Sequence, residues 1–255
     1  MSGSQLRESR GGKLRALTNT PLLLAALLAG CVCPAWANDC PPKRTMRVPD
    51  PIQPLNLDEI KKQLRTYHDQ NYNDDVAAVV SDAREWIESR ANGVKKPALV
   101  LDVDETSLSN WENLLANDLG FIEAGSCERL PKGPCGFKAW VLHHRDRPIG
   151  PTHTLFDAAR AKGLSVFFIT GRHETQRRVT ILNLHGAGYR GWTKLIMRAD
   201  SDTKRTVEAY KTEARSKIWA QGFDIIANVG DQSSDLDGGY AECTFKLPNP
   251  FYFVR

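Results

Sequence analysis

Short, continuous apolar runs that alternate with helical patterns are the feature that most constrains the fold of this chain. The four runs are Pro97–Val103, Leu164–Ile169, Thr193–Met197 and Asp224–Val229. Runs of this length and composition are typical of strands buried on both faces of a parallel sheet. Apolar residues recur at helical spacing in the intervening segments 151–162, 174–186 and 204–221. The pattern therefore predicts βαβ units and an α/β fold with a mostly parallel sheet flanked by helices.

Two more helical patterns precede the first apolar run. One covers Leu55–His68, with Asn56 or Asp58 as its N-cap, and the other covers Asp74–Ala91. The residues before them are rich in Pro and Asp and are expected to be extended. We therefore expect an N-terminal arm and helices over residues 38–94, packed on a core that spans residues 95–255.

The first 37 residues have the order of a secretory signal peptide. Basic residues precede the apolar run Pro21–Gly30, and small residues follow it. The run is too short to span a membrane comfortably, which takes roughly 20 apolar residues. Two processing sites compete, cleavage after Ala37 and lipidation of Cys31 in a lipoprotein-like Leu-Ala-Gly-Cys sequence. Both predict an exported protein, either periplasmic or secreted, or an outer-membrane lipoprotein.

The cysteine count bears on this choice. Cleavage after Ala37 would leave Cys40, Cys127, Cys135 and Cys243, an even number that suits an oxidising compartment. Three pairings are open from the count alone. Our hypothesis pairs Cys127 with Cys135 in a small loop, so that Cys40 and Cys243 join the N-terminal arm to the last strand.

Composition and charge exclude several classes of protein. With 41% hydrophobic and 25% charged residues among 255, the chain is neither collagen-like, nor low-complexity, nor a multi-span membrane protein. Most of the formal net charge of +4 comes from basic residues before residue 38. The remainder is nearly neutral and gives no electrostatic case for binding nucleic acid.

Polar residues gather at the carboxyl ends of the predicted strands. Asp102 and Asp104 end the first strand, Thr170 follows the second, and Asp231 and Asp235 follow the fourth. Right-handed crossovers bring these ends to one edge of the sheet, where α/β proteins bind ligands. Carboxylates at the end of a buried strand are costly without a positive partner, and a hard divalent cation is suitable. A hydroxyl beside a glycine turn suits a phosphate oxygen.

The order of these motifs resembles that of a known enzyme superfamily. DVDET, TGR, Lys211 and GDQSSD resemble the motifs of the haloacid-dehalogenase superfamily of phosphohydrolases. TGRHETQRRVTILNLHGAGYRGW, YKTEARSKI, NVGDQSSDL and FKLPNPFY resemble its acid phosphatase branch, which includes exported bacterial acid phosphatases, lipoprotein 5′-nucleotidases and plant vegetative-storage-type proteins. The resemblance runs from about Asn56 to the C-terminus. It implies a Rossmann-like sheet with a small cap, about residues 107–148, inserted after the first motif strand.

The resemblance also implies a role for each matching residue. Asp102 would be the nucleophile that forms an aspartyl-phosphate, and Asp104 would act as general acid and then as general base. Thr170 would hydrogen-bond the phosphoryl group, and Lys211 would neutralise charge on the nucleophile and the phosphoryl oxygens. The implied Mg²⁺ site consists of the Asp102 side chain, the Asp104 backbone carbonyl and Asp231, with Asp235 in a supporting position.

Other residues near these motifs have more than one interpretation. The aromatic residues of the expected cap could stack on a leaving-group ring or pack the cap's own core; they are Trp111, Phe121, Phe137 and Trp140. His143, His144 and His173 match no zinc spacing and are expected in exposed loops. Arg172 could contact phosphate or simply begin a helix, and it is left out of the predicted catalytic set.

The sequence as a whole implies an exported, Mg²⁺-dependent acid phosphatase that hydrolyses small phosphate monoesters, most actively at mildly acidic pH. A dedicated 5′-nucleotidase or phosphotransferase on the same fold is the alternative, because specificity depends on the cap. A non-catalytic storage or binding protein is a third possibility, which the presence of Asp102, Asp104, Lys211 and Asp231 disfavours. No nucleic-acid partner is expected, and membrane contact would come only through a lipid anchor at Cys31.

Overall fold

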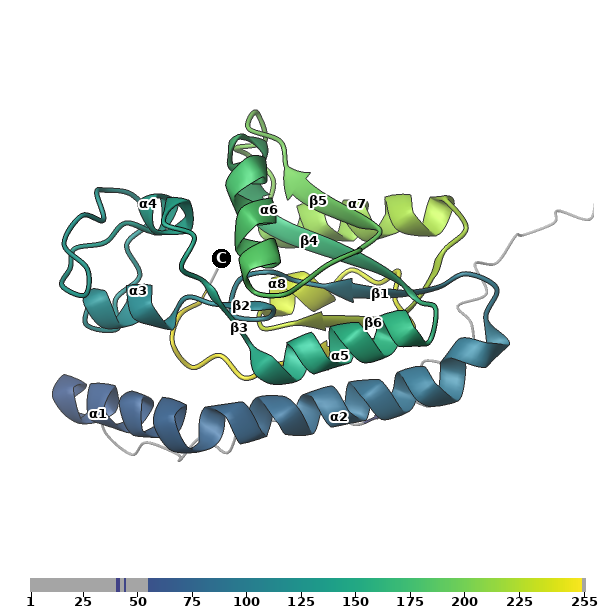
Figure 1. The fold of residues 1–255 in the computed structure, drawn as a ribbon, viewed down its shortest axis with the longest axis horizontal. Coiled ribbons are helices and arrows are strands. Elements are labelled where there is room, and N and C mark those ends of the chain that lie inside the picture. Colours follow the sequence, from purple (N-terminus) through teal and green to yellow (C-terminus); the bar gives the residue numbers. More distant parts are fainter. Residues whose placement is uncertain (1–39, 42–43, 45–54, 254–255) are drawn as a thin grey trace, which may run out of the picture. The chain divides into compact units, whose positions relative to one another are not determined.

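The structure is a computed structural model, and it describes residues 40, 41, 44 and 55–253. These residues form a five-stranded parallel sheet in the order β5-β4-β1-β6-β7 (Figure 1). The strands are β1 Pro97–Leu101, β4 Ser165–His173, β5 Lys194–Arg198, β6 Asp224–Gly230 and β7 Cys243–Lys246. The predicted α/β fold is confirmed. The predicted signal peptide and both of its processing sites lie outside the described residues.

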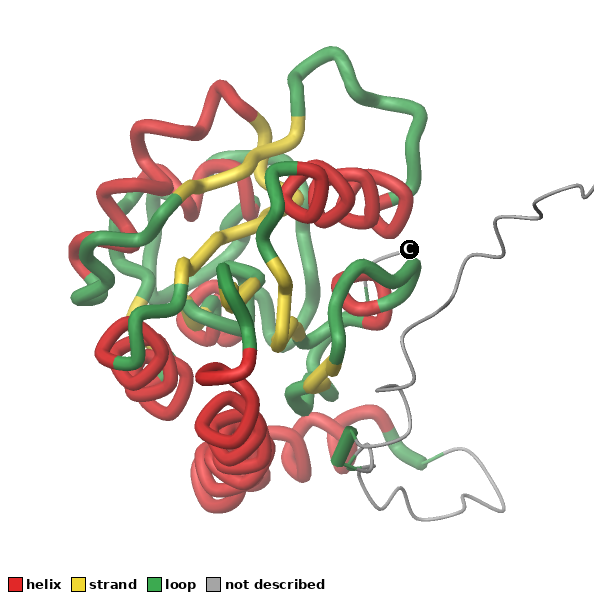
Figure 2. The backbone as a smooth tube through the Cα atoms, turned by 90° about the vertical axis from the view of Figure 1, so that its right-hand side faces the viewer, coloured by secondary structure: helices red, strands yellow, loops and turns green. Residues whose placement is uncertain are grey.

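Helices cover both faces of the sheet, so that the strands lie between them (Figure 2). On one face, α7 Val207–Ala220 packs against Val100 of β1 and Phe167 of β4. On the other face, Leu99 and Leu101 of β1 belong to a larger core that includes residues of α2 Asn73–Arg90, α5 Gly150–Ala161 and α6 Arg177–Gly186. Successive residues of β1 point to opposite faces, which is why the strand must be apolar along its whole length.

The N-terminal helices are continuous rather than separate. Helix α1 Leu57–Tyr67, capped by the Asn56 side chain, runs through a π-helical turn, His68–Tyr72, into α2. The sequence predicted two helices with a break between them, but no Gly or Pro interrupts the chain there. The turn buries Tyr72, whose ring lies 5.4 Å from that of Phe251.

The segment expected to be a cap leaves the sheet after β1 and returns before α5. It contains α3 Trp111–Ala116 and α4 Phe137–Leu142. Its two ends are paired, because β2 Leu108–Ser109 runs antiparallel to β3 Arg147–Pro148. The segment has a small core of its own, formed by Cys127, Cys135, Trp140 and Val141 with Val179 of α6. Residues 107–148 are therefore anchored at their base and partly packed on themselves.

Strand β4 is longer than predicted. The sequence placed its end at Ile169 and made Thr170-Gly171-Arg172 a turn into a helix, whereas the strand continues to His173. Its pairing with β5 becomes irregular between Thr170 and His173. Thr170 and Arg172 therefore lie within the strand, at its irregular end. The following 3₁₀ turn, Glu174–Gln176, then leads into α6.

Two disulfides join the described cysteines, Cys40 to Cys243 and Cys127 to Cys135. Both pairings are the predicted ones. The first joins the N-terminal arm to β7, and the second closes a loop within the cap segment. Among the described helices, none combines the length and apolar character needed to cross a bilayer.

The two disulfides should differ in their contribution to stability. Cys40 and Cys243 are 203 residues apart, and Cys127 and Cys135 are 8 apart. Loop-closure entropy predicts a loss of about 5 kcal/mol when the first is replaced by two alanines and about 2.5 kcal/mol for the second. Urea denaturation of the two double variants measures both losses. An equal loss in the two variants would contradict a chain-entropy origin.

Candidate active site

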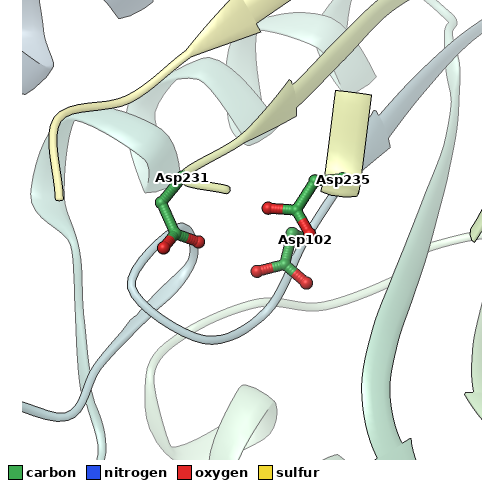
Figure 3. A group of neighbouring side chains, drawn as sticks. All are labelled: Asp102, Asp231 and Asp235. Atoms are coloured by element: carbon green, nitrogen blue, oxygen red, sulfur yellow. The ribbon is translucent and has the colours of Figure 1, made fainter. Parts of the chain in front are cut away.

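Three carboxylates meet where β1 and β6 end side by side. Asp102 follows β1, Asp231 follows β6, and Asp235 lies in the short helix α8 Ser233–Leu236 (Figure 3). The two strands are hydrogen-bonded neighbours, and Asp102 N donates to Val229 O at 3.0 Å. Each aspartate offers an oxygen within 4.8 Å of the other two, and all three residues are buried. The predicted convergence of Asp102 and Asp231 at one edge of the sheet is thus present.

Lys211 of α7 supplies positive charge to this group. Its Nζ contacts Asp102 Oδ1 and lies 2.6 Å from Asp235 Oδ1. The lysine is 3% exposed, so it is not the solvated helix residue that its surroundings in the sequence would ordinarily indicate. Although burial lowers the pKa of Lys211, the charges of Asp102 and Asp235 outweigh that effect and raise it. Lys211 is therefore a fixed cation.

One lysine does not balance three carboxylates. Burial raises the pKa of Asp102 well above its ordinary value, with Lys211 opposing and Asp235 and Asp231 adding to the rise. Burial and the charge of Asp235 raise the pKa of Asp231 to about 6. Carboxylate oxygens that are buried, close together and short of positive charge are the ligands that a hard divalent cation prefers. The donor set therefore fits a divalent metal ion.

Neutral side chains hold Asp231 in place. Thr106 Oγ1 donates to its Oδ1 at 3.0 Å, while Gln232 Nε2 and Asn249 Nδ2 donate to its Oδ2 at 2.7 and 2.6 Å. The sequence analysis quoted the motifs containing these residues but assigned them no role. Donors to a carboxylate have no periodicity or charge pattern that would mark them, so only the folded arrangement reveals them.

Asp104 lies next to Arg172 rather than next to the other carboxylates. Arg172 Nη2 donates to Asp104 Oδ1 at 2.6 Å, and its Nε lies 3.1 Å from both carboxylate oxygens. Asn110 Nδ2 also donates to Asp104, at 3.2 Å. The interpretation of Arg172 as an ordinary helix-start residue is wrong, because its side chain is 1% exposed and paired with Asp104. Its position at the end of a strand was the signal that sequence analysis undervalued.

Thr170 is fully buried next to this group. Its hydroxyl oxygen accepts a hydrogen bond from Arg172 N at 3.1 Å. Gly171 and Arg172 line the cavity described below, whereas Thr170 is not among its lining residues. The structure therefore places Thr170 at the edge of the site.

A cavity of about 350 Å³ opens above these residues. The polar side chains that line it include Asp102, Asp104, Arg172, Lys211, Asp231 and Asp235. Its aromatic walls come from the cap segment, with Phe121 and Phe137, and from the C-terminal segment, with Tyr252 and Phe253. The rings of Phe121 and Tyr252 are stacked with centroids 5.4 Å apart.

The four aromatic residues of the cap segment thus have different positions. Phe121 and Phe137 line the cavity, whereas Trp140 is buried in the segment's core and donates from Nε1 to Asn110 Oδ1 at 2.9 Å. Trp111 instead stacks on His68 of the N-terminal helices, with ring centroids 3.7 Å apart. Packing of the segment's own core is therefore confirmed for Trp140, and Trp111 fits neither interpretation offered from the sequence.

The histidines form no metal site in the part of the chain that the structure describes. His143 and His144 are exposed, as expected. His173 departs from the expectation, because it ends β4, is half-buried and lines the cavity.

Comparison with known proteins places this site in a family. The chain is 37% identical over 156 residues to acid phosphatase 1 of Solanum lycopersicum, a match that covers 61% of this chain and 58% of that protein. It is 31% identical over 156 residues to vegetative storage protein 1 of Arabidopsis thaliana, covering 61% of this chain and 54% of that protein. These matches therefore span less than two thirds of the length of those relatives.

Solved structures agree on the fold. The class C acid phosphatase of Bacillus anthracis superposes with a TM-score of 0.55 at 21% identity, covering 76% of this chain and 86% of that chain. The family model of the HAD (haloacid-dehalogenase) superfamily, subfamily IIIB (Acid phosphatase), matches residues 41–255. This match shows that the chain is a haloacid-dehalogenase-type protein, with which the fold and the grouped aspartates agree. More narrowly, the chain belongs to subfamily IIIB, the acid phosphatase subfamily, as its motifs predicted.

Loss of the buried lysine should destabilise the fold. Lys211→Met should lower the free energy of unfolding by about 3–5 kcal/mol, because it leaves buried carboxylates without their cation. The deficit should shrink as the pH falls from neutrality through the pKa of Asp231, which burial and Asp235 raise to about 6. A carboxyl with a raised pKa in the folded state gains protons on folding, so acidification favours that state. Lys211 lowers the pKa of Asp102 and Asp231, so its loss raises both values further and the variant gains more stability than wild type.

Urea denaturation in metal-free buffer at several pH values measures this deficit. The control is Lys217→Met on the same helix, where the lysine and its partner Glu213 have side chains 68% and 41% exposed. The control should change stability by less than about 1 kcal/mol. Equal midpoints for Lys211→Met and wild type would contradict the electrostatic account.

Proposed function

We propose that this protein is an exported, Mg²⁺-dependent acid phosphatase that hydrolyses small phosphate monoesters through an aspartyl-phosphate on Asp102. The observation that carries the proposal is the placement of Asp102 against Lys211 on the floor of a cavity that Asp104 also lines. A carboxylate that attacks a phosphate meets another anion, so it needs fixed positive charge beside it. Lys211 provides that charge without reorganisation.

In the first step, an oxygen of Asp102 attacks phosphorus and the bond from phosphorus to the leaving oxygen breaks. Asp104, as general acid, gives its proton to that oxygen as the bond breaks, so that an alcohol leaves. Lys211 offsets the negative charge on the transferred phosphoryl group. Thr170, at the edge of the site, supplies a hydroxyl near the phosphoryl oxygens. Activity at mildly acidic pH is proposed because the chain belongs to the acid phosphatase subfamily.

In the second step, water attacks the phosphorus of the aspartyl-phosphate. Asp104, now a carboxylate, takes a proton from that water, and the bond from phosphorus to Asp102 breaks. Inorganic phosphate leaves, and both aspartates return to their starting states. One side chain can serve both steps because it lies at the cavity but outside the group of Asp102, Asp231 and Asp235.

The metal that this proposal requires has a suitable site. The side chains of Asp102 and Asp231 and the backbone carbonyl of Asp104 would hold Mg²⁺, with Asp235 in support through its contact with Lys211. When bound, the ion supplies Lewis-acid stabilisation of phosphoryl charge. Thr106, Gln232 and Asn249 keep Asp231 oriented toward its neighbours.

Export is supported by two disulfides, which persist in oxidising compartments outside the cytosol. The basic, apolar and small-residue order of residues 1–37 is the second support. Periplasmic, secreted and Cys31-anchored forms are all consistent with both.

Two other functions are the alternatives to a general phosphatase. A dedicated nucleotidase or phosphotransferase would use the same polar residues of the cavity and would differ in the aromatic residues of its walls. A storage role is suggested by similarity to vegetative storage proteins 1 and 2 of Arabidopsis thaliana. The intact pairing of Lys211 with Asp102 and Asp235 favours an enzyme, because a storage protein has no need to bury three acids beside a single lysine.

Replacement of the proposed nucleophile should abolish turnover but not folding. Asp102→Asn keeps an oxygen that can accept from Lys211 but cannot form the phosphoenzyme, so release of inorganic phosphate should fall by about 10³-fold or more. Phosphate release from 4-nitrophenyl phosphate and near-ultraviolet circular dichroism measure the two properties. The control Asp157→Asn changes an exposed acid whose side chain is 61% accessible, and it should be fully active. Substantial activity of a folded Asp102→Asn protein would refute the mechanism.

Metal dependence should be measurable both in activity and in stability. EDTA should abolish phosphate release, and added Mg²⁺ should restore it and raise the melting temperature. Asn249→Ala removes a donor to Asp231 and should raise the Mg²⁺ concentration for half-maximal activation by about 10- to 100-fold. Full activity after exhaustive chelation would remove the metal from the proposal.

A further inference from the structure

A chain of buried polar side chains connects the proposed proton donor to the base of the cap segment. Arg172 Nη2, which donates to Asp104, also lies 3.1 Å from Asp146 Oδ2. The same oxygen of Asp146 accepts from Asn183 Nδ2 of α6 at 2.6 Å. Asp146 directly precedes β3, the strand that closes the cap segment. These hydrogen bonds therefore link the C-terminal end of the cap segment to α6, to β4 and to the cavity.

The solvent exposure of these hydrogen-bonded side chains increases toward the cavity. The side chains of Asp146 and Arg172 are 0% and 1% exposed, and that of Asp104 is 17% exposed. Among the described residues, the hydrogen bonds of the guanidinium go to these two carboxylates alone. The guanidinium also lies over the ring of Phe137, 5.9 Å from its centroid. Asp146 is thus the anchor that fixes Arg172 on the side away from the cavity.

Anchoring matters because of what Arg172 does to Asp104. The Nε and Nη2 groups hold the Asp104 carboxylate in a planar fork, whose orientation follows that of the guanidinium. Without Asp146, the guanidinium would keep hydrogen bonds only to Asp104, the group that it is meant to position. A displacement of about 1 Å in a catalytic group can cost about 10²-fold in rate.

We propose that Asp146 is a positioning residue for the proton donor Asp104 and acts through Arg172. The inference rests on the proposed function, because it assigns Asp146 to the step in which Asp104 protonates the leaving oxygen. Asp146 would thus influence protonation of the leaving oxygen from the same segment that supplies Phe121 and Phe137 to the aromatic walls of the cavity. Asp146 itself does not line the cavity, since it is absent from the residues that surround it.

The chemistry of the leaving group separates positioning from a merely structural role. An alkoxide is a strongly basic leaving group and needs a well-placed acid to protonate it, whereas 4-nitrophenolate leaves readily without protonation. A poorly placed Asp104 therefore penalises alkyl phosphates more than 4-nitrophenyl phosphate. General loss of structure penalises both substrates equally.

The test compares Asp146→Ala with wild type on a simple alkyl phosphate and on 4-nitrophenyl phosphate. We expect kcat/KM to fall by about 10- to 100-fold for the alkyl ester and by less than about 3-fold for the aryl ester. Asp146→Asn should recover most of the loss, because one amide oxygen can accept from both Arg172 and Asn183. If Asp146→Ala does not fold, Arg172→Lys, which keeps the charge but loses the fork, should give the same selective loss.

The matched control is Glu242→Gln, which alters a partly buried, two-point arginine pair with Arg90 outside the cavity. It should leave the ratio of the two substrates unchanged. An equal loss on both substrates, no loss at all, or failure of Asp146→Asn to recover activity would overturn the inference. If wild type cleaves neither ester, or Asp102→Asn remains active, the proposed function itself fails and this inference with it.

Discussion

The contact between Lys211 and the buried aspartates is the interaction on which the site depends. Three carboxylates at the meeting point of β1, β6 and α8 would be too costly to bury without positive charge. Lys211 reaches them from α7, a helix that belongs to one face of the sheet, and so ties that face to the strand ends. The negative charge still left over makes the same cluster suitable for a divalent cation. Stability and chemistry therefore depend on the same few atoms.

Much of this arrangement could be predicted from the sequence because topology decides it. Apolar runs indicate the strands, and parallel connections put their carboxyl ends at one edge of the sheet. The pairing of β1 with β6 then brings Asp102 and Asp231 together. Asn249 and Thr106 could not be predicted in this way. They act as single hydrogen-bond donors from distant loops, and nothing in the periodicity or charge of the sequence marks such a residue.

Other differences come from contacts that only the folded chain makes. The π turn at His68–Tyr72 joins two predicted helices because tertiary packing of Tyr72 against Phe251 favours it, whereas local sequence contains no breaker to decide the matter. Arg172 was undervalued for a related reason. Glycine before it suggested a turn, but the irregular pairing of β4 with β5 keeps it in the strand and directs it to Asp104.

The segment 107–148 is more closely tied to the chemistry than a simple cover would be. Asn110 donates to Asp104 and accepts from Trp140, so the segment's small core contacts the proposed proton donor from one side. Asp146 reaches the same carboxylate through Arg172 from the other side. A substitution in this segment that changes the aromatic walls is therefore expected to disturb Asp104, the proposed proton donor, as well. Because both functions depend on one segment, specificity and proton transfer in this protein are expected to change together.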